Sequence, residues 1–116
     1  MSDAPPYTVH TAYTADAPEH AQVLAWTGPA VLDFGTPWCG HCRRAAPVVE
    51  SALARHPCVR HVRVEDGAGR RLGRQFGVKL WPTLVFLLDG QEVCRLVRPT
   101  EAADVAQALE RIDPRG

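Results

Sequence analysis

Short apolar runs alternate along the chain with amphipathic stretches, and the runs predict the strands of a sheet. Residues 30–34 are almost entirely apolar and lie between Gly28-Pro29 and Gly35, which is typical of a central strand covered on both faces. Asp33 is the one charged residue in this run and is unusual there. Further strands are predicted at 58–64, 83–88 and 91–97, the last two joined by the hairpin signal Asp89-Gly90.

The amphipathic stretches predict helices at 19–26, from the residues after Trp38 to Arg55, near 70–76 and after Thr100. The second helix is expected to kink at Pro47, because proline has no N–H and crowds the preceding turn. Gly77 is expected to end the third helix, and Thr100 to cap the last one. The order of elements predicts an α/β fold in which a mixed central sheet is sandwiched between helices.

Composition is that of one soluble globular domain. The chain has 116 residues, of which 46% are hydrophobic and 22% charged. This length suits a single hydrophobic core, so we expect one domain over 1–116. Within it, 1–13 is predicted to be a loosely ordered segment with a short edge strand.

Charge and hydropathy exclude two classes of partner. Lysine plus arginine and aspartate plus glutamate both number 13, which argues against a nucleic-acid or anionic-membrane surface. The longest apolar run, Leu84 to Leu88, is far shorter than the ~20 residues that cross a bilayer, and the first residues lack the features of a signal sequence. We therefore expect a cytoplasmic monomer with no nucleic-acid or membrane partner.

Two of the four cysteines form the motif Cys39-Gly40-His41-Cys42 at the start of a predicted helix. Thiols at this spacing close a small disulfide ring. The free N–H groups and the dipole of the helix favour the anion of Cys39, which makes it the nucleophile in thiol–disulfide exchange, and Cys42 then resolves the mixed disulfide. As a cation, His41 would stabilise the Cys39 thiolate further.

With its flanking residues, the motif resembles the thioredoxin superfamily over roughly residues 20–112. In that family a buried aspartate stands six residues before the first cysteine, as Asp33 does, and a proline five residues after the second, as Pro47 does. A cis-proline faces the disulfide at the place held here by Trp81-Pro82-Thr83. The resemblance implies the thioredoxin fold and a protein disulfide oxidoreductase. Its partners would be protein disulfide or dithiol substrates and an upstream reductase or oxidant, with no cofactor beyond the Cys39–Cys42 disulfide.

The resemblance also implies roles for the surrounding residues. Asp33, buried below Cys42, would accept the proton of the resolving thiol. A cis Pro82 would present the backbone of Trp81 to an extended substrate chain. The residues expected to contact substrate are Trp38, Gly40, Trp81, Pro82, Thr83 and Arg98.

Three departures from the family pattern bear on function. Gly35 stands in place of a common tryptophan, and Arg63 in place of the lysine that usually accompanies the buried acid. Arg98-Pro99 occurs where the family often has a glycine beside the substrate groove. We therefore expect altered acid–base tuning and substrate choice. Cys-Gly-His-Cys is more similar to the disulfide isomerase type of site than to the Gly-Pro version of general reductases, so the direction of exchange stays open.

The sequence leaves two alternatives, a different site and a different function. The Cys-x-x-Cys pair is half of a zinc site, but Cys58 and His61 offer no second paired spacing, so we predict no metal. Cys58 and Cys94 are instead predicted to be small buried strand residues. A binding or chaperone module with this fold and little turnover is the alternative function, and the intact cysteine pair with Asp33 and Pro82 favours catalysis over it.

Overall fold

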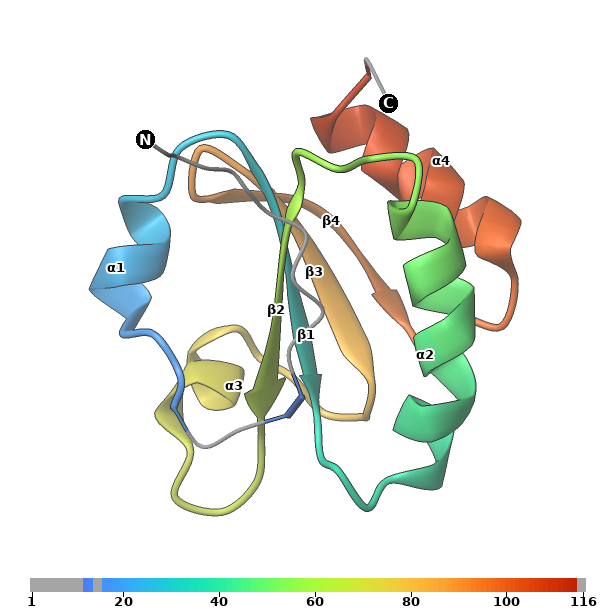
Figure 1. Ribbon diagram of the computed structural model, residues 1–116. Coiled ribbons are helices and arrows are strands. Elements are labelled where there is room, and N and C mark those ends of the chain that lie inside the picture. The colour runs from blue at the N-terminus through green and yellow to red at the C-terminus, as the bar shows by residue number, and fades with distance from the viewer. Residues whose placement is uncertain (1–11, 14–15, 115–116) are drawn as a thin grey trace.

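A mixed four-stranded sheet forms the centre of the computed structural model, which describes residues 12–13 and 16–114 (Figure 1). The strand order is β2-β1-β3-β4, with β1 parallel to β2, β1 antiparallel to β3, and β3 antiparallel to β4. This confirms the mixed sheet predicted from the sequence. The strands are β1 (Pro29–Gly35), β2 (Arg60–Glu65), β3 (Thr83–Leu88) and β4 (Gln91–Val97).

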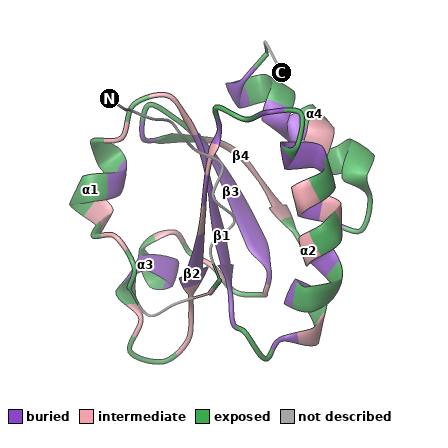
Figure 2. Ribbon diagram, in the orientation of Figure 1, coloured by how far each residue is buried: buried purple, intermediate pink, exposed green. Residues whose placement is uncertain are grey.

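Helices cover both faces of the sheet. The short helices α1 (His20–Leu24) and α3 (Arg71–Gln75) lie on one face, and α2 (Gly40–Leu53) and α4 (Ala102–Ile112) on the other. Figure 2 shows the buried positions concentrated in the sheet and on the inward sides of the helices. A central strand with helices on both sides is buried on both faces, which explains why β1 is almost entirely apolar.

The alternation of side chains along β1 places Asp33 beneath α2. Val31 packs into the core between the sheet and α2 and α4, whereas Leu32 and Phe34 belong to the core on the α1 and α3 side. Because successive side chains of a strand point to opposite faces, Asp33 lies on the same face as Val31. The strand therefore carries its single carboxylate to the side of the sheet where the cysteine-bearing helix packs.

The predicted hairpin between β3 and β4 is confirmed. Its turn residues Asp89 and Gly90 both have positive φ values, 51° and 79°, as a two-residue turn that matches the strand twist requires. The Asp89 carboxylate accepts a hydrogen bond of 2.7 Å from the backbone N–H of Gly28. The turn is therefore tied to the loop that leads into β1.

The structure corrects three local predictions. Cys58 is exposed in a turn, because β2 begins only at Arg60 and Val59 is the residue that turns into the core. Thr100 does not cap the last helix: the N-cap is Glu101, which makes no side-chain capping bond. The first helix is shorter than predicted, with α1 ending at Leu24.

Other local predictions have different outcomes. The helix-ending role of Gly77 is confirmed by its positive φ of 69°. Helix α2 continues through Pro47. Cys94 is partly buried in β4 against the α2 and α4 core, as predicted for a strand residue.

The segment and edge strand predicted in 1–13 fall mostly outside the described residues. None of the helices in the described ranges combines the length and apolar character that a membrane span requires.

A pair of glycine variants would test how tightly the hairpin packs. A Cβ on Gly90 would overlap the backbone carbonyl of Leu24, whereas a Cβ on Gly69 would meet nothing, although both glycines have φ near 80°. We expect Gly69→Ala to cost about 1 kcal/mol of unfolding free energy through backbone strain alone, and Gly90→Ala about 3 kcal/mol because overpacking is added. Urea unfolding measures both. Equal costs would contradict the close packing.

Candidate active site

Cys39 lies at the mouth of α2, as its place in the sequence predicted. It is the N-cap residue of the helix, and its Sγ accepts the backbone N–H of Cys42 at 3.2 Å. The sulfur therefore occupies a position where an unpaired helix N–H and the helix dipole favour negative charge. Both cysteines are free thiols in the structure, and Cys39 is 8% exposed against 2% for Cys42. Cys39 is therefore the more exposed of the two cysteines.

Cys42 is held in its neutral form. Burial, followed by the hydrogen bond with Cys39, raises the pKa of the Cys42 thiol to about 12. Contacts with the Thr36 backbone and with the Tyr13 side chain act in the opposite direction but do not reverse the shift. The second thiol must therefore lose a proton to a nearby group before it can attack a mixed disulfide.

The Asp33 carboxylate is buried and receives three polar contacts. The Tyr13 hydroxyl donates to its Oδ1 at 2.6 Å, and Arg63 Nε donates to its Oδ2 at 3.3 Å. His61 Nε2 lies 3.0 Å from the same Oδ2. A carboxylate withdrawn from water is costly unless it is paired and hydrogen-bonded. These contacts, two of them from β2, meet that requirement.

Arg63 stands where the family resemblance leads us to expect a lysine, and it bonds to two acidic residues. Its Nε contacts Asp33, and its Nη2 donates to Glu50 of α2 at 3.0 Å. Burial alone would lower the pKa of Arg63, but the charge of Asp33 and the bond with Glu50 raise it. The guanidinium therefore stays charged and connects the buried acid to a partly exposed one.

Gly35 makes room for Tyr13 beside Cys42. A Cβ on Gly35 would lie 2.5 Å from Cys42 Sγ and 2.8 Å from Tyr13 Cζ, so the thiol and the tyrosine ring both pack against the bare glycine. Burial and the nearby Asp33 charge raise the pKa of Tyr13, which keeps its hydroxyl protonated. Tyr13 thus contacts both Asp33 and the Cys42 thiol, and occupies space that a larger residue at position 35 would fill.

Two of the predicted substrate-contacting residues, Trp38 and Trp81, form part of the surface next to Cys39. Trp38 is 67% exposed, and its ring meets that of Trp81 edge to face with centroids 5.6 Å apart. The Trp81 indole donates to Asp66 at 2.8 Å. The Trp81–Pro82 peptide bond is cis, as the family resemblance implied. This contact of two tryptophans brings the residue before Cys39 and the residue before the cis-proline together.

Three of the predicted contact residues have more internal positions, and one of them is the buried Pro82. Thr83 is buried, and its hydroxyl donates to the Leu80 carbonyl at 2.6 Å, so its side chain holds the loop rather than facing a partner. Gly40 is the first residue of α2 and is partly buried. Arg98, by contrast, is exposed, and its Nε donates to the Trp81 carbonyl at 2.8 Å.

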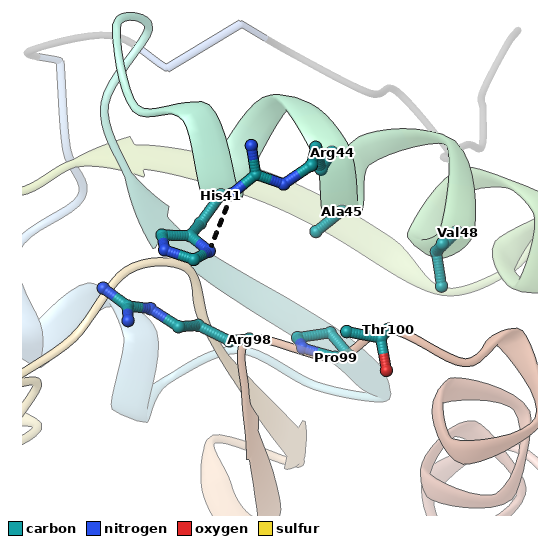
Figure 3. Close-up of a pocket in the computed structure, with 7 residues that line it drawn as sticks. All are labelled: His41, Arg44, Ala45, Val48, Arg98, Pro99 and Thr100. Carbon is teal, nitrogen blue, oxygen red and sulfur yellow. Dashed lines mark hydrogen bonds between the residues drawn. The ribbon is translucent and has the colours of Figure 1, made fainter.

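Positive charge gathers beside the cysteine turn. His41, Arg44 and Arg98 line one pocket, and Arg44 Nη2 donates to His41 Nδ1 at 3.1 Å (Figure 3). The charge of Arg98, then desolvation and the charge of Arg44, lower the pKa of His41. These charges oppose the cationic form that the sequence suggested for His41, and the two arginines supply the positive charge instead.

Among the described residues, no group of three or more His, Cys, Asp or Glu side chains is placed to hold a metal.

Comparison with known proteins identifies the family. The Thioredoxin family model matches residues 11–111. The chain belongs to the thioredoxin family. Thioredoxin 1 of Synechococcus elongatus is 33% identical over 101 residues, which cover 86% of this chain and 94% of that protein. The solved structure of reduced thioredoxin 2 from Pseudomonas aeruginosa is 48% identical, with a TM-score of 0.82, and the match covers 93% of this chain and all of that one.

Relatives of the isomerase type also match. Protein disulfide-isomerase A3 of Gallus gallus is 32% identical over 98 residues, covering 84% of this chain but 19% of that protein. The thioredoxin fold and the thiol–disulfide oxidoreductase activity predicted from the sequence are confirmed by family membership. A binding module with little turnover is not favoured.

Three residues of this thioredoxin site were missed by sequence reasoning. Tyr13 lies in a segment without a clear pattern, His61 was considered only as a metal ligand, and Asp66 was not singled out. All three act through contacts between segments far apart in the chain. Only Tyr13 had a signal in the sequence. Gly35 has no side chain where the family often has a tryptophan, so another group had to fill that space.

The different surroundings of the two thiols predict selective alkylation. With limiting iodoacetamide at pH 8, we expect Cys39 to be modified long before Cys42, because a thiol with a pKa of about 12 is ionised in about one molecule in ten thousand at that pH. Mass mapping in a Cys58→Ser background, which removes the exposed competing thiol, measures the order. Earlier modification of Cys42 would reverse the assignment of the two thiols.

Proposed function

We propose that this thioredoxin-family protein reduces disulfides in polypeptide partners through Cys39 and Cys42 and is itself re-reduced by an upstream dithiol reductase. One observation carries the proposal: the Cys39 sulfur caps α2 beside the exposed Trp38 and the partly buried Trp81. A nucleophile favoured as an anion is thus joined to an aromatic surface of the kind that dominates protein interfaces.

The reaction proceeds in two exchanges. The Cys39 thiolate attacks one sulfur of the partner disulfide, a new S–S bond forms, and the other partner sulfur leaves as a thiolate. Cys42 then loses its proton and attacks Cys39 Sγ, which expels the second partner thiolate. The partner gains two electrons and the protein ends with a Cys39–Cys42 disulfide. The thiols carry both electrons, so the exchange needs no added cofactor.

Asp33 and Tyr13 serve the second exchange. Because the Cys42 thiol has a raised pKa, its attack needs a proton acceptor. Tyr13 touches the thiol and donates to Asp33, so its hydroxyl accepts the Cys42 proton while passing its own to the carboxylate. Asp33 is the final acceptor and Tyr13 the relay. His61 and Arg63 hold the carboxylate in position.

We place this activity in the cytoplasm, as a contribution to redox homeostasis by a monomeric protein. A dithiol site that must be kept reduced suits a compartment whose reductases maintain free thiols. The bacterial thioredoxins among its relatives support this placement.

The proposal is tested by trapping the intermediate. A protein that carries a disulfide is supplied as substrate, and no other reduced protein is present. Under these conditions Cys42→Ser is expected to accumulate a mixed disulfide on Cys39, because the second exchange is blocked. Turnover with dithiothreitol as electron donor should fall by at least about a hundredfold. Non-reducing electrophoresis and mass mapping measure the adduct.

Two matched variants control for the other thiols. Cys58→Ser and Cys94→Ser remove sulfurs that lie outside the site, and both should keep normal turnover. Full turnover by Cys42→Ser, or an adduct on Cys58, would refute the proposed route.

The proton relay predicts a step-specific defect. Tyr13→Phe keeps the ring that fills the space at Gly35 but removes the hydroxyl, so we expect the second exchange to slow about tenfold while the first changes little. Asp33→Asn should slow the same step by about a hundredfold. Stopped-flow kinetics separate the two exchanges. Equal slowing of both steps in Tyr13→Phe would point to a structural role instead.

A further inference from the structure

A pocket of about 240 Å³ lies directly beside the cysteine turn and is not used by the exchange chemistry. It is formed by the first turns of α2 and by the segment 98–100 that follows β4 (Figure 3). Basic side chains gather at one end, with Val48, Pro99 and Thr100 at the other. His41, which stands between the two cysteines, is part of its wall, so a ligand in the pocket would lie next to the reacting sulfurs.

The positive charge of the pocket is not neutralised within the described part of the protein. Its lining holds His41, Arg44 and Arg98 but no acidic residue. None of the Asp and Glu side chains in the described ranges forms an ion pair with either arginine. The lowered pKa of His41 reflects the same field, because both arginines oppose its protonation. An anion placed here would relieve this repulsion.

The two arginines are held in place before any ligand arrives. Arg98 donates its Nε to the Trp81 carbonyl at 2.8 Å, and its backbone has a positive φ of 52°, which is uncommon for a residue with a side chain. Arg44 donates its Nη2 to His41 Nδ1 at 3.1 Å. Because their geometry is already set, a ligand pays little ordering entropy on binding.

The shape of the pocket selects the kind of anion. The planar end of an arginine matches a carboxylate, and Ala45, Val48 and Pro99 offer an apolar wall for the methylene groups that carry it. The bond between Arg98 and the Trp81 carbonyl places the charge beside the aromatic surface and the cis-proline loop. A ligand that reaches Cys39, this surface and the pocket together is a polypeptide.

We propose that the pocket formed by His41, Arg44 and Arg98 binds the carboxylate of an aspartate or glutamate that lies within a few residues of the reactive cysteine in the polypeptide partner. This inference rests on the proposed function, since it assigns the substrate class of the same site. The pocket then makes partners with acidic residues beside their disulfide the preferred substrates.

Matched peptides test the preference. Each peptide carries one disulfide and a single Glu, Gln or Lys, moved through the three positions on either side of the cysteine. Single-turnover oxidation of the reduced full-length protein gives a second-order rate constant for each. At the best position we expect the Glu peptide to react about fivefold faster than its Gln partner, as a partly exposed ion pair allows, and the Lys peptide to react more slowly. Added salt should shrink the difference.

Variants assign the preference to the pocket. In Arg44→Gln/Arg98→Gln, the Glu-to-Gln rate ratio should fall to about one. The ratio is taken within each protein, so a general change in cysteine reactivity cancels. Arg55→Gln is the matched control for Arg44→Gln: it removes one positive charge beyond the far end of α2, roughly 16 Å along the helix axis from Arg44, and should keep the preference. Arg44→Gln alone should reduce the ratio part-way without touching the loop that Arg98 holds.

The outcomes separate the inference from the proposed function. Equal rates for Glu and Gln peptides at every position, or a preference that survives the double variant, would overturn the pocket while leaving the reductase intact. Failure to reduce any peptide would overturn the proposed function itself. Oxidised glutathione forms a further arm: if its rate alone depends on the two arginines, the pocket serves small-molecule carboxylates and the polypeptide assignment is wrong.

Discussion

The burial of one carboxylate constrains the whole active end of the molecule. Asp33 lies in a central strand whose two faces are both covered, and it faces α2, the helix that contains Cys42 and is preceded by its N-cap residue Cys39. A buried charge is tolerated only where polar partners replace water. Those partners come from β2 and from the segment before α1, so the contacts that satisfy Asp33 join β2 to β1 and bring Tyr13 to Cys42, while Arg63 also bonds to Glu50 of α2. The contacts that hold these segments together are therefore also the contacts that position the acid and the tyrosine beside Cys42.

Position 35 differs from the family pattern, because a glycine stands there in place of the common tryptophan. The space beside Cys42 is therefore filled in a different way. A tryptophan at that position would fill the space next to the second cysteine with its own side chain. Here the space is filled by a ring from elsewhere in the chain, as the close packing of protein interiors requires. The replacement is not neutral in chemistry, because the tyrosine ring carries a hydroxyl between Cys42 and Asp33. A hydroxyl that both donates and accepts at this point adds a path for the proton.

The sequence predicted the parts of the structure that depend on local physics. The apolar run of β1, the Asp89-Gly90 turn and the place of Cys39 at a helix start each follow from residues close together in the chain. Boundaries were weaker: β2 starts two residues later than predicted, which exposes Cys58. The contacts of Tyr13 and His61 with Asp33 join distant segments, and neither periodicity nor spacing carries information about such pairs. The cis peptide before Pro82 was available only through family resemblance.

The distribution of charge around Cys39 changes the meaning of the histidine in the motif. An imidazolium between the cysteines would favour the thiolate in a way that disappears as pH rises through the histidine pKa. The charges of Arg98 and Arg44 lower that pKa, so near neutral pH the positive charge next to the turn belongs to the guanidinium groups. Arginine keeps its proton throughout this range. The positive charge beside the cysteine turn therefore does not depend on pH in this range, and the two side chains that carry it form the wall on which an acidic partner would dock.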